Sequence, residues 1–234
     1  MALELYYSSG SDVFDDYTGE PRKSIGGYLT DVQAPSDTLK ALFGTVSIRM
    51  LTEGVTDYRM LYLKSTKDIT ALDVHTDVPL VASVVNPVDL APAPSLGDAW
   101  IVPEDGEGDW IGKDGKKATY NGASWDFDFA PFTQWAYAFV EPTDLVDDPI
   151  TGKHVRRTEN VFQPPSGLTF TSADAEANKI AIGDGTLAAG GVLGMWIKRT
   201  TVATVFEKED LVKDGGGVKV EESITLKFSF DDGN

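Results

Sequence analysis

The feature that most constrains this chain is an alternation of side-chain character, with a period of two residues, that recurs along it. Successive side chains of a β-strand point to opposite faces of a sheet, so this period predicts strands rather than helices. It is clearest from Ile224 to Phe230, where we expect one face to pack on a core and the other to meet water. Similar alternation runs from Tyr58 to Leu63, from Trp135 to Val140 and from Leu193 to Ile197. The sequence therefore predicts an all-β fold.

Helical periodicity is nearly absent. A short helix is predicted over residues 36–43, where Ser36 can cap the first turn. A second helical turn, over residues 173–179, suits a loop equally well. The chain has 234 residues, enough for a sizeable core, and its 23 glycines and 12 prolines supply the turns that many short strands need. We therefore expect an antiparallel β-sandwich of jelly-roll or immunoglobulin-like type.

A proline-rich segment, residues 86–95, interrupts this pattern. It predicts an extended linker, because proline denies donors to a sheet and stiffens the backbone. The stretch after it is rich in Trp, Tyr and Phe, and Pro131 ends that stretch. We therefore expect an inserted module over residues 85–131, and an outer domain in which residues 1–84 join residues 132–234.

Turn dipeptides organise the module. Asp114-Gly115 and Asn121-Gly122 favour type I′ hairpin turns, because both central residues of such a turn need positive φ. Strands are expected over residues 109–113, 116–120 and 123–129, and together they predict a small β-meander. A unit of this size buries little surface, so its aromatic side chains must supply its core.

Composition excludes several classes of function. The formal net charge of −17 gives an acidic surface that repels nucleic acid and anionic membranes, and we expect it mainly to keep the protein soluble. The absence of cysteine excludes disulfides, zinc–thiolate sites and cysteine nucleophiles. The N-terminus carries no leader pattern, and no stretch approaches the roughly 18 apolar residues of a spanning helix. We expect synthesis in the cytoplasm and no membrane insertion.

No constellation of residues predicts catalysis. His75 and His154 are the only histidines, and neither lies in a Ser/His/Asp pattern. His154 falls in a polar stretch that we expect to be a solvated loop. Asp126 and Asp128 share a predicted strand face, as many acid pairs do on the wet side of an acidic sheet. Glycine-rich runs lack the third glycine and the following helix of a nucleotide fingerprint. We therefore expect no enzyme and no cofactor.

Carboxylates gather in one glycine-containing loop of the module. Such a loop offers the oxygen ligands that a hard cation such as Ca²⁺ prefers, but it lacks the spacing of an EF-hand. A solvated hairpin loop is the favoured interpretation, so these residues are only a weak cation candidate. They are Glu104, Asp105, Glu107 and Asp109.

The aromatic rings of the module are glycan-binding candidates. The faces of Trp and Tyr stack on the apolar faces of sugars, although packing in the module's own core is the favoured interpretation for each ring. Asp98 and Asn121 are better explained as turn formers than as sugar ligands. The candidate rings are Trp100, Trp110, Tyr120 and Trp125.

A series of short motifs spans most of the outer domain in order. They are Ser24-Ile25-Gly26-Gly27, Leu42-Phe43, residues 57–64 (DYRMLYLK), residues 164–170 (PPSGLTF), Ile182-Gly183-Asp184 and residues 194–200 (GMWIKRT). In these motifs the outer domain resembles a family of small virion proteins of tailed bacteriophages. The resemblance implies that Tyr58, Arg59, Trp196 and Arg199 are landmarks of its fold and assembly.

The module carries three motifs of its own: residues 94–102 (PSLGDAWIV), residues 110–115 (WIGKDG) and residues 121–127 (NGASWDF). In these it resembles a second kind of phage unit, found in tail-fibre and head-spike proteins. Units of that kind are associated with host surface glycans, so the resemblance implies a glycan partner for the module.

Together these resemblances imply a non-enzymatic structural component of a bacteriophage virion. Its place would be an accessory position on the head, as in capsid decoration, or at the neck or tail surface. Its partners would be other virion proteins, and we expect many copies that form a symmetric homo-oligomer. One alternative is host attachment through glycan recognition by the module. A second is a glycan-degrading enzyme, which needs two carboxylates roughly 5–10 Å apart in a cleft.

Overall fold

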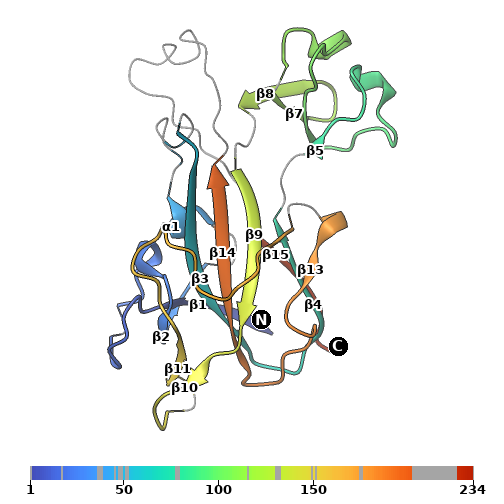
Figure 1. The fold of residues 1–234 in the computed structure, drawn as a ribbon. Helices are drawn as coiled ribbons and strands as arrows, with labels where there is room; N and C mark the ends of the chain where they lie inside the picture. Colours follow the sequence, from blue (N-terminus) through green and yellow to red (C-terminus); the bar gives the residue numbers. More distant parts are fainter. Residues whose placement is uncertain are drawn as a thin grey trace. The chain divides into compact units, whose positions relative to one another are not determined.

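The computed structural model describes residues 2–16, 18–35, 39–44, 46, 50, 53–76, 80–114, 116–129, 133–148, 150, 152–173, 176–201 and 226–233. The chain divides into two compact units, and almost all of their regular structure is β (Figure 1). The first unit joins Met1–Asp77 with Thr133–Asn234, and the second spans Val78–Phe132. Within the described ranges, no helix is long and apolar enough to cross a membrane.

The first unit is built on an eight-stranded sheet whose neighbouring strands are all antiparallel. Its longest strands, β3, β14 and β9, lie side by side, with Met60 opposite Trp196 and Trp196 opposite Ala138 (Figure 1). In spatial order the strands are β10 (Thr143–Asp144), β11 (Lys153–Val155), β2 (Gly27–Gln33), β1 (Leu3–Ser8), β3 (Val55–Ser65), β14 (Val192–Thr201), β9 (Thr133–Val140) and β12 (Thr171–Ser172).

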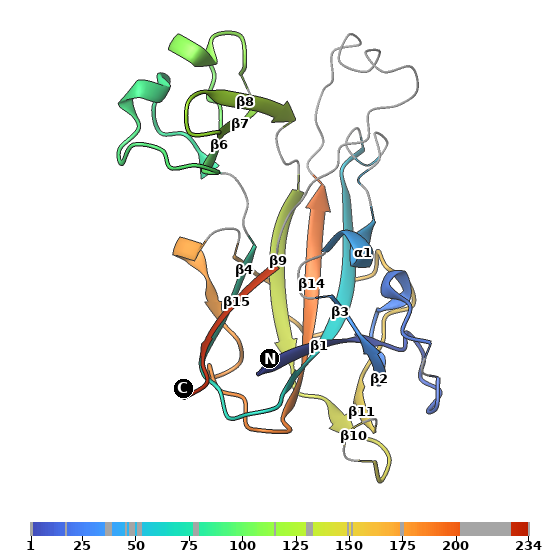
Figure 2. The ribbon, with the colours of Figure 1, turned by 180° about the vertical axis from the view of Figure 1, so that it is seen from behind.

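A second sheet and a helix cover one face of this large sheet. The second sheet contains β13 (Ile180–Ala181), β4 (Thr70–Thr76) and β15 (Leu226–Asp231), again antiparallel. Thr76 of β4 hydrogen-bonds to the hydroxyl of Tyr137 on β9 at 2.7 Å. Figure 2 shows α1 (Leu39–Phe43) in front of β3 on this face. The result is an all-β, sandwich-like fold, as the sequence predicts.

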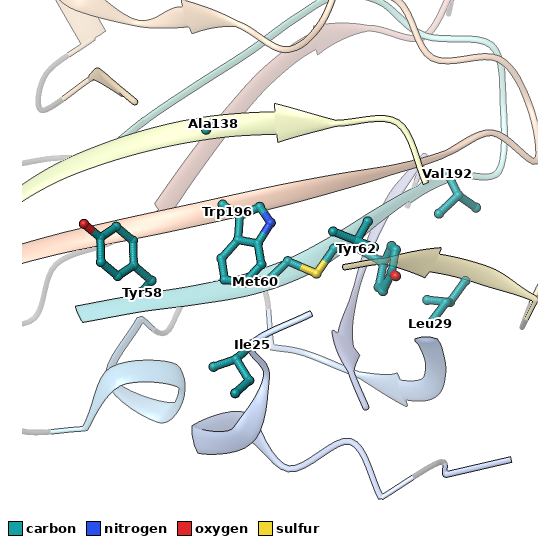
Figure 3. Packing of buried hydrophobic residues seen from close by; sticks show 9 residues of the cluster. Ile25, Leu29, Tyr58, Met60, Tyr62, Ala138, Val192 and Trp196 are labelled. Atoms are coloured by element: carbon teal, nitrogen blue, oxygen red, sulfur yellow. The ribbon is translucent and has the colours of Figure 1, made fainter. Parts of the chain in front are cut away.

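The other face of the large sheet packs against the chain that leads into β2 and follows β11. Its core contains Tyr58, Met60 and Tyr62 from β3, together with Trp196 from β14 (Figure 3). The alternating segments over 58–63 and 193–197 are therefore buried on both faces of the sheet. Their successive side chains point alternately into the cores on the two sides of the sheet. In the last strand Leu226 is buried and Lys227 is exposed, as expected, whereas Phe228 and Phe230 are only partly buried. Ile224 lies outside the described residues.

The predicted short helix is present, and of the two possibilities left open over residues 173–179 the structure has a helical turn. Residues Leu39–Phe43 form α1, and Glu176–Asn178 form the 3₁₀ turn η4. The predicted cap at Ser36 lies outside the described residues. Pro21–Lys23 form a further 3₁₀ turn, η1.

The second unit contains a four-stranded sheet rather than the predicted three-stranded meander. Its order is β5 (Leu80–Val81), β6 (Ala99–Ile101), β7 (Lys116–Tyr120) and β8 (Trp125–Phe129), with β5 parallel to β6. Because β5 already pairs within this sheet, the unit begins at Val78 and not at residue 85.

The strand predicted over residues 109–113 is wrong. Gly108–Trp110 form the 3₁₀ turn η3, in which the N–H of Ile111 donates to the carbonyl of Gly108. Glycines at 108 and 112, with φ of 56° and 67°, turn the chain away from an extended path. β6 takes the place of the missing strand.

The proline-rich segment is also more than an extended linker. Pro87–Asp89 form the 3₁₀ turn η2, in which the N–H of Val88 donates to the side chain of Asn86. Pro87 is buried, and Leu90 packs against the core of the second unit. This segment therefore belongs to the module's packed structure.

The hairpin between β7 and β8 is displaced by one residue from its predicted position. The N–H of Asn121 donates to the carbonyl of Ser124, so Gly122 and Ala123 are the central residues of the turn. Of these two, only Gly122 has positive φ, as in a type II′ turn and not type I′. At the other predicted turn, the N–H of Lys116 donates to the carbonyl of Lys113, while Gly115 lies outside the described residues.

Gly194 offers a test of how closely the core beneath Trp196 is packed. A Cβ at this position would lie 2.8 Å from Met60 Cε, 2.9 Å from Val140 Cγ1 and 3.0 Å from Val155 Cγ2. We expect Gly194→Ala to lower the free energy of unfolding by about 1–3 kcal/mol, measured by denaturant titration. Adding Val155→Ala should recover part of that loss, because it removes one of the three obstructing groups. Strictly additive effects of the two substitutions would contradict this account.

Candidate functional site

The aromatic candidates of the module lie on one face of its sheet. Trp100 pairs with Ala118, and Tyr120 pairs with Trp125, which places these side chains on a common face. The ring of Trp125 contacts Trp100 at 5.7 Å, Trp110 at 5.4 Å and Tyr120 at 5.2 Å between centroids. Edge-on and tilted geometries of this kind are the favourable ones for aromatic pairs. Trp125 is therefore the centre of the cluster.

Trp110 plays a different part from the other three rings. It is fully buried, as is Ala118, and together with Val102 and Ala82 it forms the module's core. The small Ala118, in register between larger neighbours, leaves room for the Trp110 ring. Trp110 is thus corrected from a glycan-binding candidate to a core residue.

The remaining three rings, Trp100, Tyr120 and Trp125, are partly buried and partly exposed. Each has an edge or face in contact with a neighbouring ring and a remainder open to solvent. Such a surface can stack on the apolar face of a flat ligand, so these three rings stay glycan-binding candidates.

The polar neighbours of these rings serve the turns. The side chain of Asn121 accepts hydrogen bonds from the N–H groups of Ala123 and Ser124 at 3.1 and 2.9 Å. Asp98 accepts one from the N–H of Ser95 at 2.8 Å. The predicted role of Asp98 and Asn121 as turn formers is confirmed.

The acidic loop of the module does not assemble a metal site in the described part of the chain. No group of three or more Asp, Glu or His side chains converges there, and those of Glu104, Asp105, Glu107 and Asp109 are exposed. The cation hypothesis is therefore corrected in favour of the solvated loop.

The landmarks of the outer domain include a buried ion pair. Arg199 on β14 lies opposite Asp57 on β3, and its Nη2 is 2.9 Å from Asp57 Oδ2 while Nε donates to Oδ1 at 3.0 Å. The two side chains are 3% and 4% exposed. This two-pronged geometry is the strongest that arginine and a carboxylate can form.

Two arginines also hold the end of α1. Arg199 donates to the carbonyls of Gly44 and Phe43 at 3.0 and 3.3 Å, and Arg59 donates to that of Leu42 at 3.0 Å. Both guanidinium groups lie over the ring of Phe43, at 5.0 Å for Arg199 and 5.3 Å for Arg59. Cations at a helix C-terminus satisfy carbonyls that have no partner within the helix. We call these residues, with Asp57, the arginine clamp.

Burial shapes the chemistry of the clamp. Removal from water lowers the pKa of Arg59. The negative charge of Asp57 opposes this shift, and the positive charges of Arg199 and Arg22 add to it. Tyr58 and Trp196 lie on the opposite face of the sheet, in the core drawn in Figure 3. All four landmarks are therefore buried in the first unit, where they hold the fold together.

The two histidines are both built into strands. His75 is buried in β4, and His154 lies in β11, so the solvated loop expected around His154 is wrong. The ring of His154 packs on Tyr28 at 4.7 Å, and its Nε2 lies 3.0 Å from Asp12 Oδ1. Burial raises the pKa of the Asp12 carboxyl, but hydrogen bonds from His154 and Arg157 outweigh it and leave the pKa lowered.

One cavity was not foreseen from the sequence. A pocket of about 180 Å³ lies beside Trp196, and its lining comes mostly from the segment after β11, together with Val140 and Val155. No sequence pattern marks it, because its lining comes from segments far apart in the chain.

The arginine clamp predicts a large effect of breaking one charge pair. We expect Arg199→Met to lower the free energy of unfolding by about 3–5 kcal/mol, because it leaves the Asp57 carboxylate buried and unpaired. Replacing both partners, Arg199→Met with Asp57→Leu, should be less damaging than the single change. Lys23→Met, which breaks an exposed pair with Glu20, is the matched control and should cost under about 0.5 kcal/mol. Equal effects at the two sites, in denaturant titration, would contradict the assignment.

The module predicts an equally clear contrast between two neighbouring residues. Trp110→Ala should remove about 3–5 kcal/mol of the module's stability, because it empties the centre of a small core. Ile111→Ala, at an apolar residue that is 71% exposed, should leave it nearly unchanged. Hydrogen exchange of the β7 and β8 amides reports the stability of the module itself. Similar protection in both variants would show that Trp110 is not the core residue described.

Comparisons of the chain with protein-family models, with curated proteins and with solved structures give no match. No relative therefore supplies a substrate, a partner or a site residue. The function has to be inferred from this chain's own side chains.

Proposed function

We propose that this chain is a non-enzymatic structural protein of a bacteriophage-like virion, and that it assembles through protein–protein contacts. The proposal starts from the order of landmark motifs in the outer domain and from the kind of module inserted into it. Arg59, Arg199 and Asp57 are buried in the arginine clamp, where they stabilise the fold. These charged residues therefore have a structural role, which supports the proposal.

The observation that most favours assembly is a set of large apolar side chains left in solvent. Four of them in the first unit are half exposed or more: Val13, Leu145, Ile150 and Phe162. Isolated apolar residues are common on protein surfaces, but several on linked segments mark an interaction surface.

These segments are joined by hydrogen bonds. Asp12, next to Val13, accepts from Arg157 at 2.9 Å and lies 3.0 Å from the ring nitrogen of His154 in β11. Leu145 and Ile150 lie in the β10–β11 hairpin, and Phe162 lies in the segment after β11. We infer that the surface formed by the segments of Val13, Leu145 and Ile150 contacts neighbouring virion proteins or further copies of the chain.

The test is incorporation into particles. Particles purified from the source should contain this chain in many copies, and Leu145→Ser with Ile150→Ser should reduce its incorporation severalfold while the free protein keeps its unfolding midpoint. Val88→Ser, at an exposed apolar residue of the second unit, is the control that should leave incorporation unchanged. Absence of the chain from purified particles would overturn the proposal.

The alternative function is recognition of host surface glycans by the module. The observation that favours it is the partly exposed cluster of Trp100, Tyr120 and Trp125. Tyr120→Ala at the border of this cluster separates the two functions. Normal incorporation with reduced adsorption to host cells would favour recognition, whereas unchanged adsorption favours a structural role alone.

A further inference from the structure

The pocket beside Trp196 lies on the face of the large sheet that the segment after β11 covers. Figure 1 shows this segment crossing in front of β3 and β14. Its lining includes the apolar Trp196, Val140, Val155 and Leu168 and two prolines. The remaining lining residues are polar: Arg156, Arg157, Thr158, Glu159, Gln163 and Ser166. At about 180 Å³ it is smaller than the roughly 300–1,000 Å³ of pockets for drug-sized ligands, and it suits one large apolar side chain.

The walls are held by the packed core behind them. Trp196 is fully buried among Met60, Ala138 and Ile25 (Figure 3). Because Gly194 has no side chain, the methyl groups of Val140 and Val155 approach the sheet closely. These walls cannot close the pocket without disturbing the core.

The polar side is fixed by main-chain hydrogen bonds. The N–H of Thr158 donates to the carbonyl of Ile25 at 3.0 Å, and the N–H of Tyr58 donates to that of Val161 at 2.7 Å. The side chain of Gln163 accepts from the N–H of Glu159 at 3.1 Å. The pocket is therefore formed before any ligand arrives, which reduces the entropic cost of binding.

The unused polar groups of the pocket indicate what it binds. Arg157 already pairs with Asp12 at 2.9 Å, whereas the exposed Arg156 has no hydrogen bond or ion pair with the described residues. The buried indole N–H of Trp196 likewise has no acceptor in the described part of the chain. That N–H is enclosed by the protein, so Arg156 is the group of the two that is open to a ligand.

We propose that this pocket binds an amino-acid residue that carries both a large apolar side chain and a free carboxylate. The apolar side chain packs against Val140 and Leu168, above the buried Trp196, and the carboxylate pairs with Arg156. The same chemistry is offered by the C-terminal residue of a partner chain and by a free apolar amino acid. Glu159, which also lines the pocket, can pair with the ammonium group of the free form. This site is independent of the proposed virion role.

The test uses three probes with the same side chain and different end groups: N-acetyl-L-phenylalanine, its C-terminal amide, and L-phenylalanine. The readout is the indole N–H resonance of Trp196 in a ¹⁵N-labelled full-length chain, assigned with Trp196→Phe. We expect the acetylated acid to shift this resonance and to bind about tenfold or more tightly than its amide, because the amide loses a charge-assisted bond. Arg156→Ala should abolish that difference, and Lys23→Ala, at an exposed cation outside the pocket, should preserve it.

Binding of L-phenylalanine, compared with that of the acetylated acid, distinguishes the two sources of the ligand. If L-phenylalanine binds more tightly than the acetylated acid, and Glu159→Gln removes this advantage, the ligand is a free amino acid. If the acetylated acid binds as well or better, the ligand is a chain terminus. Equal binding of the acid and the amide, or no shift of the Trp196 resonance at millimolar concentrations, would overturn the proposal.

Discussion

The fold of the first unit depends on the ion pair between Arg199 and Asp57. Charges removed from water destabilise a protein unless they are paired and hydrogen-bonded, and the arginine clamp meets both conditions. The Asp57 carboxylate accepts two hydrogen bonds from Arg199. Arg199 also donates to the carbonyls of Phe43 and Gly44 at the end of α1. Because the charges satisfy groups of the helix as well as one another, they hold α1 against the sheet.

The same pair fixes the register of the central strands. Arg199 lies opposite Asp57 on one side and opposite Trp135 on the other, whose ring meets Phe43 edge-on at 5.1 Å. A shift of one residue between β3 and β14 would move the charges to the other face, into the apolar core around Met60. Such a shift would leave both charges buried and unpaired, which is strongly destabilising, so the pair disfavours wrong registers.

The sequence predicted the strands of the first unit better than it predicted which of their faces are buried. Alternation says which side chains share a face, but it carries no information on what covers that face. The strand from Tyr58 to Leu63 was therefore predicted correctly, while the burial of both its faces had to come from the structure. In the module, the strand over residues 109–113 was predicted from the turn dipeptide that follows it, and the positive φ angles of Gly108 and Gly112 could not be foreseen. The true strand, Ala99–Ile101, is too short to show a period.

The candidate sites were predictable to different degrees for a related reason. A turn is local, so Asp98 and Asn121 were assigned correctly from their immediate neighbours. A pocket is not local: the one beside Trp196 joins the end of β9, the end of β11, the segment that follows and the middle of β14. No spacing in the chain brings those residues together before the sheet has formed. Exposure is equally non-local, which is why Trp110 could not be separated from Trp100 and Trp125 by sequence alone.

Strand β14 connects these observations, because its two faces carry different tasks. Arg199 points to the face that holds α1, and Trp196, three residues earlier, points to the face that forms the pocket. β14 pairs along its whole length with β3 and along much of it with β9, so its backbone has no freedom to adjust to a ligand. A group that enters the pocket therefore meets a rigid wall, and selectivity must come from the rim, where Arg156 and Glu159 are exposed. The buried charges on one face thus provide the rigidity that a selective site on the other face requires.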